Sequence, residues 1–212
     1  MSENRLRILG VSASPRRKAT HRAVGEALRY AHERHGVATD YFTASGKTLG
    51  FCVQCDVCIR KRDGCAFDDG MQDLYRLLTR ADAVILGTPV YQGGLSGQLK
   101  TIMDRCRALV ATDPDALRDK PCAGVAVGGD RNGGQESALR QIHDFCLLNL
   151  MVPVGGGAYG SNLGAAVWSQ DRGAEGVDDD EIGVKSIHRT VDRLVQVALL
   201  LRAGRDAAGS GR

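Results

Sequence analysis

The chain has 212 residues, enough to bury the core of one domain of ordinary to large size. Hydrophobic residues make up 43% and charged residues 25%, and the net charge of +3 is too small to indicate a nucleic-acid-binding protein. No apolar run approaches the roughly 18 residues of a membrane helix, so no membrane partner is expected. The N-terminal residues do not resemble a secretory signal, so we expect a cytoplasmic protein with reduced cysteines.

Short apolar runs alternate with helical patterns along the chain. Strands are expected at 5–11, 37–43, 82–87, 120–127 and 151–154. Helices are expected at 19–35, 71–80, 98–110, 137–150 and 183–201, where apolar residues recur on one face. This α/β alternation predicts a doubly wound parallel sheet in one domain, 1–203, followed by a disordered tail, 204–212. The glycine-rich, acidic stretch 155–181 shows no periodicity and is expected to be a functional loop or an oligomer contact.

Three unusual loops follow strands at the edge where ligands bind in such folds. The first, 12–20, offers hydroxyls, cations and backbone N–H groups at a helix start, which suits a phosphate; a capped helix with solvated cations explains it equally well. It matches neither G-x-G-x-x-G nor G-x-x-x-x-G-K-[ST], which disfavours a dinucleotide or a magnesium–nucleotide site. The second and third loops, 88–96 and 128–136, are glycine-rich and let backbone approach a planar ligand. Each loop alone could be a plain turn or cap, but their coincidence at one edge favours a ligand site.

Four of the seven cysteines lie within 51–73 at the spacing C-x2-C-x2-C-x6-C: Cys52, Cys55, Cys58 and Cys65. Clustered thiols in a reducing compartment favour a metal or catalytic site over disulfides. A cubane iron–sulfur cluster suits this spacing, because three thiolates of one loop and a later fourth can surround it. Zinc is less favoured, because structural zinc sites use two separate C-x2-C knuckles; cysteines that only pack remain another alternative. The other three, Cys106, Cys122 and Cys146, are expected to be buried.

The stretches S-A-S-P-R-R, T-P-V-Y-x-G-G-x-S-G-Q-L-K and G-G-x-R-N-G-G-Q-E resemble the FMN-binding loops of the flavodoxin-like, NADPH-dependent FMN reductase family. The cysteine spacing followed by D-D-G-M-Q resembles its iron–sulfur flavoprotein branch, although Gly70 interrupts the usual D-M pair. The resemblance covers about 5–160. It implies a three-layer α/β/α fold, a five-stranded parallel sheet in the order 2-1-3-4-5, a cysteine-rich insertion at about 46–70, and a homodimer or homotetramer.

The resemblance also implies site residues. The FMN phosphate would contact Ser12, Ser14, Arg16, Arg17 and Thr20. The isoalloxazine would lie against Pro89, Val90, Tyr91, Gln92 and Gly93, with its other edge near Gly129, Arg131, Asn132 and Gly133. The ligands of a 4Fe-4S cluster would be Cys52, Cys55, Cys58 and Cys65. No acid or base is implied, because the flavin carries the chemistry. For Trp168, a cover over the flavin, a subunit contact and a core or surface position stay open.

The expected function is an FMN-dependent oxidoreductase that takes electrons from NAD(P)H and passes them between FMN and a 4Fe-4S cluster. One alternative is a non-enzymatic electron carrier fed by a ferredoxin-like partner. Another is a cluster-free NAD(P)H-dependent quinone, azo or metal-ion reductase of the same fold. The expected electron acceptor is a small molecule or a protein.

Overall fold

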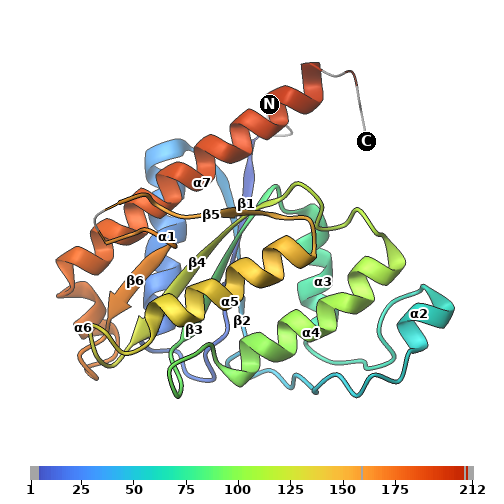
Figure 1. Ribbon diagram of the computed structural model, residues 1–212, viewed down its shortest axis with the longest axis horizontal. Coiled ribbons are helices and arrows are strands. Elements are labelled where there is room, and N and C mark those ends of the chain that lie inside the picture. The colour runs from blue at the N-terminus through green and yellow to red at the C-terminus, as the bar shows by residue number, and fades with distance from the viewer. Residues whose placement is uncertain (1–4, 159, 208, 210–212) are drawn as a thin grey trace.

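The computed structural model describes residues 5–158, 160–207 and 209, and Figure 1 shows a sheet with helices on both faces. The strands are β1 Arg7–Ser12, β2 Ala38–Thr43, β3 Ala83–Pro89, β4 Pro121–Gly128, β5 Val152–Val154 and β6 Ala165–Trp168. The helices are α1 Ala19–His35, α2 Val57–Lys61, α3 Met71–Arg80, α4 Gly97–Thr112, α5 Gln135–Leu148, α6 Ala174–Asp178 and α7 Glu181–Ala207. None of the described helices is both long and apolar enough to span a membrane.

The strands are parallel in the order β2-β1-β3-β4-β5, which confirms the expected order. Side chains alternate between the two faces of each strand. Ile8 and Ile85 therefore pack against α1 and α7, whereas Leu9 and Leu86 pack against α3 and α4. Burial on both faces explains why the central strands are continuous apolar runs.

A sixth strand, β6, was not expected. β5 pairs with residues 121–123 of β4 and β6 pairs with residues 125–128, so the two short strands share one side of β4 in succession. The stretch 155–181 thus contains β6 and α6 rather than only loop. Elements of four and five residues are too short to show a hydrophobic period, which is why the sequence pattern missed them.

Two further segments bear on the expected boundaries. The cysteine-rich segment leaves the sheet after β2 and carries α2, which lies beside α4 (Figure 1). Its base is closed by a hydrogen bond from Gly70 N to Thr48 O at 3.1 Å. At the other end of the chain, α7 continues to Ala207, so residues 204–207 of the expected tail are helical; 208 and 210–212 lie outside the described residues.

A buried carboxylate joins α1 to α7. The Glu26 side chain is 4% exposed and binds Arg22, Arg29 and His188. Burial alone would raise the pKa of Glu26, but hydrogen bonds from Arg29, His188 and Arg22 outweigh it and lower the pKa to about 2. The ionised carboxylate therefore stabilises the contact between these two helices.

Candidate functional site

A cavity of about 460 Å³, here called the loop-edge cavity, opens where β1, β3 and β4 end. Its volume is in the range of small-molecule sites. Its walls come from the three predicted loops and from the segment between β6 and α6. The lining residues are Ser14, Arg16, Arg17, Lys18, Ala19, Thr20, Pro89, Val90, Tyr91, Val127, Gly129, Ser169, Asp171, Arg172, Gly173, Ala174 and Glu175.

The N-terminus of α1 forms one wall of the loop-edge cavity. Lys18 at the N-cap makes no side-chain cap, and the first turn contains no acid. The N–H groups of that turn are therefore left for a ligand or water. Arg16 and Arg17 line the same wall, and Ser14 Oγ shapes their loop by accepting from Arg16 N at 3.1 Å. Backbone N–H groups at an uncapped helix N-terminus, next to arginine side chains, are suited to bind an anion such as phosphate.

Ser12 does not line the cavity. It ends β1, is fully buried, and its Oγ has no hydrogen-bond partner among the described residues. Thr20, also buried, does belong to the cavity wall. The structure therefore gathers Ser14, Arg16, Arg17 and Thr20 around one space and leaves Ser12 beneath it.

The loop after β3 is a tight turn. Tyr91 and Gly94 exchange two backbone hydrogen bonds of 2.9 and 3.1 Å, with Gln92 and Gly93 between them at φ values of 49° and 76°. This two-residue turn requires positive φ at both central positions. Val90 N donates to Val127 O at 2.9 Å and ties the turn to β4.

Only part of that turn faces the loop-edge cavity. Pro89, Val90 and Tyr91 line the cavity, whereas Gln92 and Gly93 do not.

The loop after β4 packs against the turn after β3 and is also fixed by its own hydrogen bonds. A Cβ at Gly134 would stand 2.7 Å from Gly93 Cα, so the two loops touch only because glycine is present. Gln135 is buried, and its Nε2 donates to Asp130 O at 2.6 Å and to Val167 O at 3.3 Å. Gln135 belongs to the third glycine-rich loop of the sequence, but it was not among the predicted site residues.

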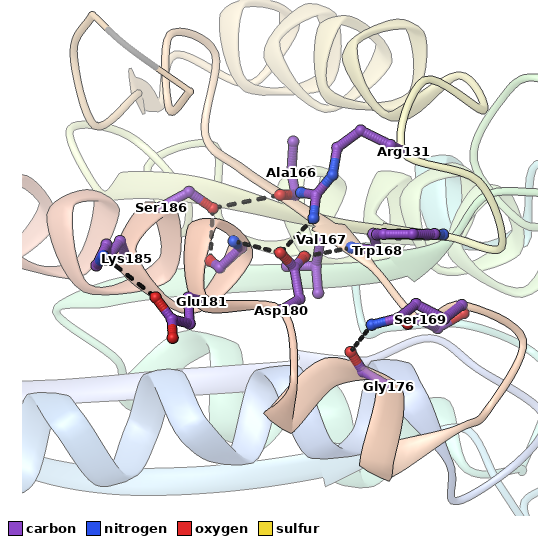
Figure 2. Close-up of polar contacts among 12 residues, drawn as sticks. Arg131, Ala166, Val167, Trp168, Ser169, Gly176, Asp180, Glu181, Lys185 and Ser186 are labelled. Carbon is purple, nitrogen blue, oxygen red and sulfur yellow. Dashed lines mark hydrogen bonds and ion pairs between the residues drawn. The ribbon is translucent and has the colours of Figure 1, made fainter.

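Arg131 points toward Asp180 (Figure 2). It pairs with this buried carboxylate and lies over Trp168, with the guanidinium carbon 5.2 Å from the ring centroid. Asp180 also accepts from Trp168 N at 2.7 Å and from Gly183 N at 2.9 Å, which caps the start of α7. Arg131 and Asn132 line a neighbouring cavity of about 340 Å³ instead of the loop-edge cavity.

The fourth wall, 169–175, lies within the stretch 155–181 that was expected to be a functional loop or an oligomer contact, but none of its residues was predicted as a site residue. Trp168 Nε1 donates to Gly129 O at 2.5 Å and anchors the segment to the loop after β4. A Cβ at Gly129 would stand 2.6 Å from Asp171 Oδ1, so the segment packs closely over this glycine. Gln170 and Asp171 both have φ of 53°. Gly129 lines the loop-edge cavity, whereas Gly133 does not.

The four cysteines of the 46–70 segment share a second, smaller pocket, here called the cysteine pocket. Cys52 and Cys55 are exposed, and Cys58 and Cys65 are partly buried. Within the described residues, no three or more His, Cys, Asp or Glu side chains form a group that could hold a metal ion. The lining residues are Cys52, Val53, Gln54, Cys55, Asp56, Cys58, Cys65, Ala66, Phe67, Asp104, Arg105, Arg107 and Ala108.

The backbone around the cysteine pocket is unusual. Gln54, Asp56 and Arg62 all adopt left-handed conformations, with φ of 50°, 58° and 56°. Such a conformation costs a non-glycine residue roughly 1–2 kcal/mol. Strain of this kind clusters where the chain is shaped for a ligand. The donor set is four thiols without imidazole, which fits an iron–sulfur cluster.

The remaining cysteines are buried, as expected. Burial raises the pKa of Cys106 to about 12. A hydrogen bond with Cys146 and burial both raise the pKa of Cys122. All three thiols pack in the core.

The chain is similar to known proteins over most of its length. Residues 6–165 match the family model for NADPH-dependent FMN reductase. An iron–sulfur flavoprotein of Methanocaldococcus jannaschii is 52% identical over 91% of this chain and 96% of its own, and one of Archaeoglobus fulgidus is 48% identical over 90% and 96%. A solved flavodoxin, WrbA-like protein from Agrobacterium tumefaciens shares the fold, with a TM-score of 0.60 at 16% identity over 94% of this chain and 99% of its own. The chain belongs to the NADPH-dependent FMN reductase family, in its iron–sulfur flavoprotein branch.

Proposed function

We propose that this protein is an FMN-dependent oxidoreductase that also carries a 4Fe-4S cluster on Cys52, Cys55, Cys58 and Cys65. The observation that carries the proposal is the loop-edge cavity, in which an uncapped helix N-terminus and the cations Arg16, Arg17 and Lys18 adjoin a wall of close-packed backbone. That combination suits a monophosphate attached to a planar ring. Family membership supports the same cofactor.

Arg16, Arg17 and the first turn of α1 would hold the FMN phosphate. Their positive charge and free N–H groups favour a dianion. Thr20 supplies a buried hydroxyl at the same end. Lys18 adds a further positive charge to this wall. These charges and hydrogen-bond donors would fix the phosphate end of FMN in the loop-edge cavity.

Pro89, Val90, Tyr91 and Gly129 would orient the ring. Val90 and Pro89 offer apolar contact, and Tyr91, which is partly exposed, can stack on a ring or donate to it. Gly129 has no side chain, so its backbone can approach the ring closely. The neighbouring turns would supply the remaining predicted contacts to the ring: Gln92, Gly93, Arg131, Asn132 and Gly133. Bound FMN supplies the redox chemistry, because flavins exchange both hydride and single electrons.

The cysteine segment would supply the four thiolates of the cluster. Its backbone already surrounds one pocket, and the exposure of Cys52 and Cys55 leaves a path for assembly. Iron–sulfur names among close relatives support the same assignment. NAD(P)H is the proposed donor, on family grounds.

A second candidate is an electron carrier fed by a ferredoxin-like protein. Phe51 and Val53, which flank Cys52, are 72% and 64% exposed, and such an apolar surface beside the thiols suits a protein partner. Mixing the anaerobic protein with NADPH, NADH or a reduced ferredoxin separates the two candidates. Fast flavin bleaching by a nicotinamide supports the enzyme, and bleaching by ferredoxin alone supports the carrier.

We also propose a homodimer or homotetramer. An apolar groove between α4 and α5, lined in part by Met103, Val110 and Phe145, has a volume of about 860 Å³. Leu148, which also lines the groove, is 84% exposed, and the adjacent Leu147 is 63% exposed. Light scattering of the purified protein measures the oligomeric state, and a monomer at micromolar concentration contradicts the proposal.

A further inference from the structure

Arg105 is a charged side chain in the core beneath the cysteine segment. It lies in α4 and is 2% exposed. A buried guanidinium is unfavourable unless it is paired and hydrogen-bonded. Its partners therefore indicate what it does: the guanidinium donates to Gly50, Cys65 and Asp69, all within residues 50–69.

The guanidinium joins both ends of the cysteine segment. Arg105 Nη1 donates to Gly50 O at 3.2 Å and forms an ion pair with the carboxylate of Asp69. Asp69 also accepts from Gly50 N at 2.9 Å. Gly50 comes just before the first cysteine and Asp69 just after the last, so these contacts close the segment at its base.

The same side chain reaches one of the thiols. Arg105 Nη2 donates to Cys65 Sγ at 3.3 Å. The guanidinium also lies over the Phe67 ring, with Arg105 Cζ 5.2 Å from the ring centroid. The Phe67 ring and the Asp69 carboxylate together fix the position of the donor. A fixed, buried cation thus contacts the sulfur assigned as the last ligand of the cluster.

We propose that Arg105 is a positioning residue for the iron–sulfur cluster: it holds the cysteine segment closed and, through its hydrogen bond to Cys65, raises the reduction potential of the cluster. This inference rests on the cluster of the proposed function. A thiolate-ligated cluster gains one negative charge when it accepts one electron from the flavin. A nearby cation stabilises the more negative, reduced form most, and hydrogen bonds to sulfur are among the factors that set such potentials.

Arg107 provides a matched control. It lies on the same helix and lines the same pocket, but it pairs with Asp56 at 2.8 Å and its side chain is 38% exposed. Removing it deletes the same charge from the same pocket without deleting the bond to Cys65. Because Arg107 is more exposed, solvent screens its charge more than that of Arg105. Arg107→Met therefore controls for the loss of a pocket charge, and Arg105→Lys, which keeps the buried charge, separates charge from guanidinium geometry.

The first test is a redox titration of the reconstituted holoprotein, followed by electron paramagnetic resonance. Arg105→Met should lower the equilibrium constant for one-electron reduction of the cluster about tenfold, which corresponds to about 59 mV. Arg105→Lys should lower it less, and Arg107→Met by less than about threefold. Potentials equal to wild type in Arg105→Met, or equal shifts in the two Met variants, overturn the proposal. If Arg105→Met does not fold, Arg105→Met/Asp69→Asn is compared with Asp69→Asn, so that the two proteins differ only in Arg105 and neither has an unpaired carboxylate at position 69.

The second test needs no cluster. In the metal-free, FMN-loaded protein, Arg105→Met should speed amide hydrogen exchange across 50–69 and leave the central strands unchanged. Unchanged exchange in that segment overturns the positioning role. A wild-type protein that takes up no iron or sulfide overturns the cluster and this inference together, whereas a loaded Arg105→Met with unchanged potential overturns this inference alone.

Discussion

Gly134→Ala tests whether the contact between the second and third loops builds the flavin site. The new Cβ would stand 2.7 Å from Gly93 Cα, whereas ordinary contact begins at 3.4 Å, so the loops must part by about 0.7 Å. Gly134 also has φ of 112°, where a side chain adds strain of about 1–3 kcal/mol. We expect the dissociation constant of FMN to rise at least about tenfold, or about 1.4 kcal/mol.

Gly36→Ala is the control for backbone strain. Gly36 ends α1 at φ of 65° with open space around it, far along the helix from the loop-edge cavity. It should lose about 1 kcal/mol of stability and keep its affinity for FMN. Flavin fluorescence quenching gives the affinity, and thermal melting gives the stability. The reasoning is refuted if Gly134→Ala binds FMN as tightly as Gly36→Ala does.

Three further predictions follow from individual side chains. Arg17→Gln should weaken FMN binding about tenfold and leave riboflavin binding unchanged, because riboflavin has no phosphate; equal losses in titrations with both ligands would count against the phosphate site. Burial would raise the pKa of Glu26, but its cationic partners lower it from 4.5 to about 2. The ionised carboxylate therefore stabilises the fold above pH 4.5, and the free energy of unfolding should fall by about 3 kcal/mol as the pH drops toward 2. Urea unfolding across that range checks this loss, and constant stability would contradict it. Cys65→Ser should lose iron and sulfide but keep FMN, whereas Cys106→Ser should keep the cluster and FMN. Equal iron contents in the two variants would exclude Cys65 as a ligand.

Strong local patterns predicted most of the fold. The helices expected at 19–35 and 71–80 have those bounds in the structure, because their apolar faces are periodic and Gly36 ends the first in a left-handed conformation. The short elements β6 and α6 escaped prediction because four or five residues show no period. Pairing of β6 with the second half of β4 is a long-range contact that local sequence does not encode.

The site was predictable where it follows strands and unpredictable where it depends on distant contacts. The three loops were placed correctly at one edge, because the carboxyl ends of parallel strands meet there. The wall at 169–175 comes from a segment whose sequence is only glycine-rich and acidic. Arg105 could not be identified either, because its partners Asp69 and Cys65 are 36 and 40 residues away. A helical pattern shows which face is apolar, but it does not show which charge is buried by tertiary contacts.

Counting the cofactors bound to each chain shows whether one domain carries both FMN and an iron–sulfur cluster. The protein would be purified under argon, its absorbance spectrum recorded, and FMN, iron and sulfide measured per chain. We expect a brown-yellow protein with about one FMN released by heat and about four iron and four sulfide per chain. A colourless protein that cannot be reconstituted with FMN, iron and sulfide would rule out both cofactors.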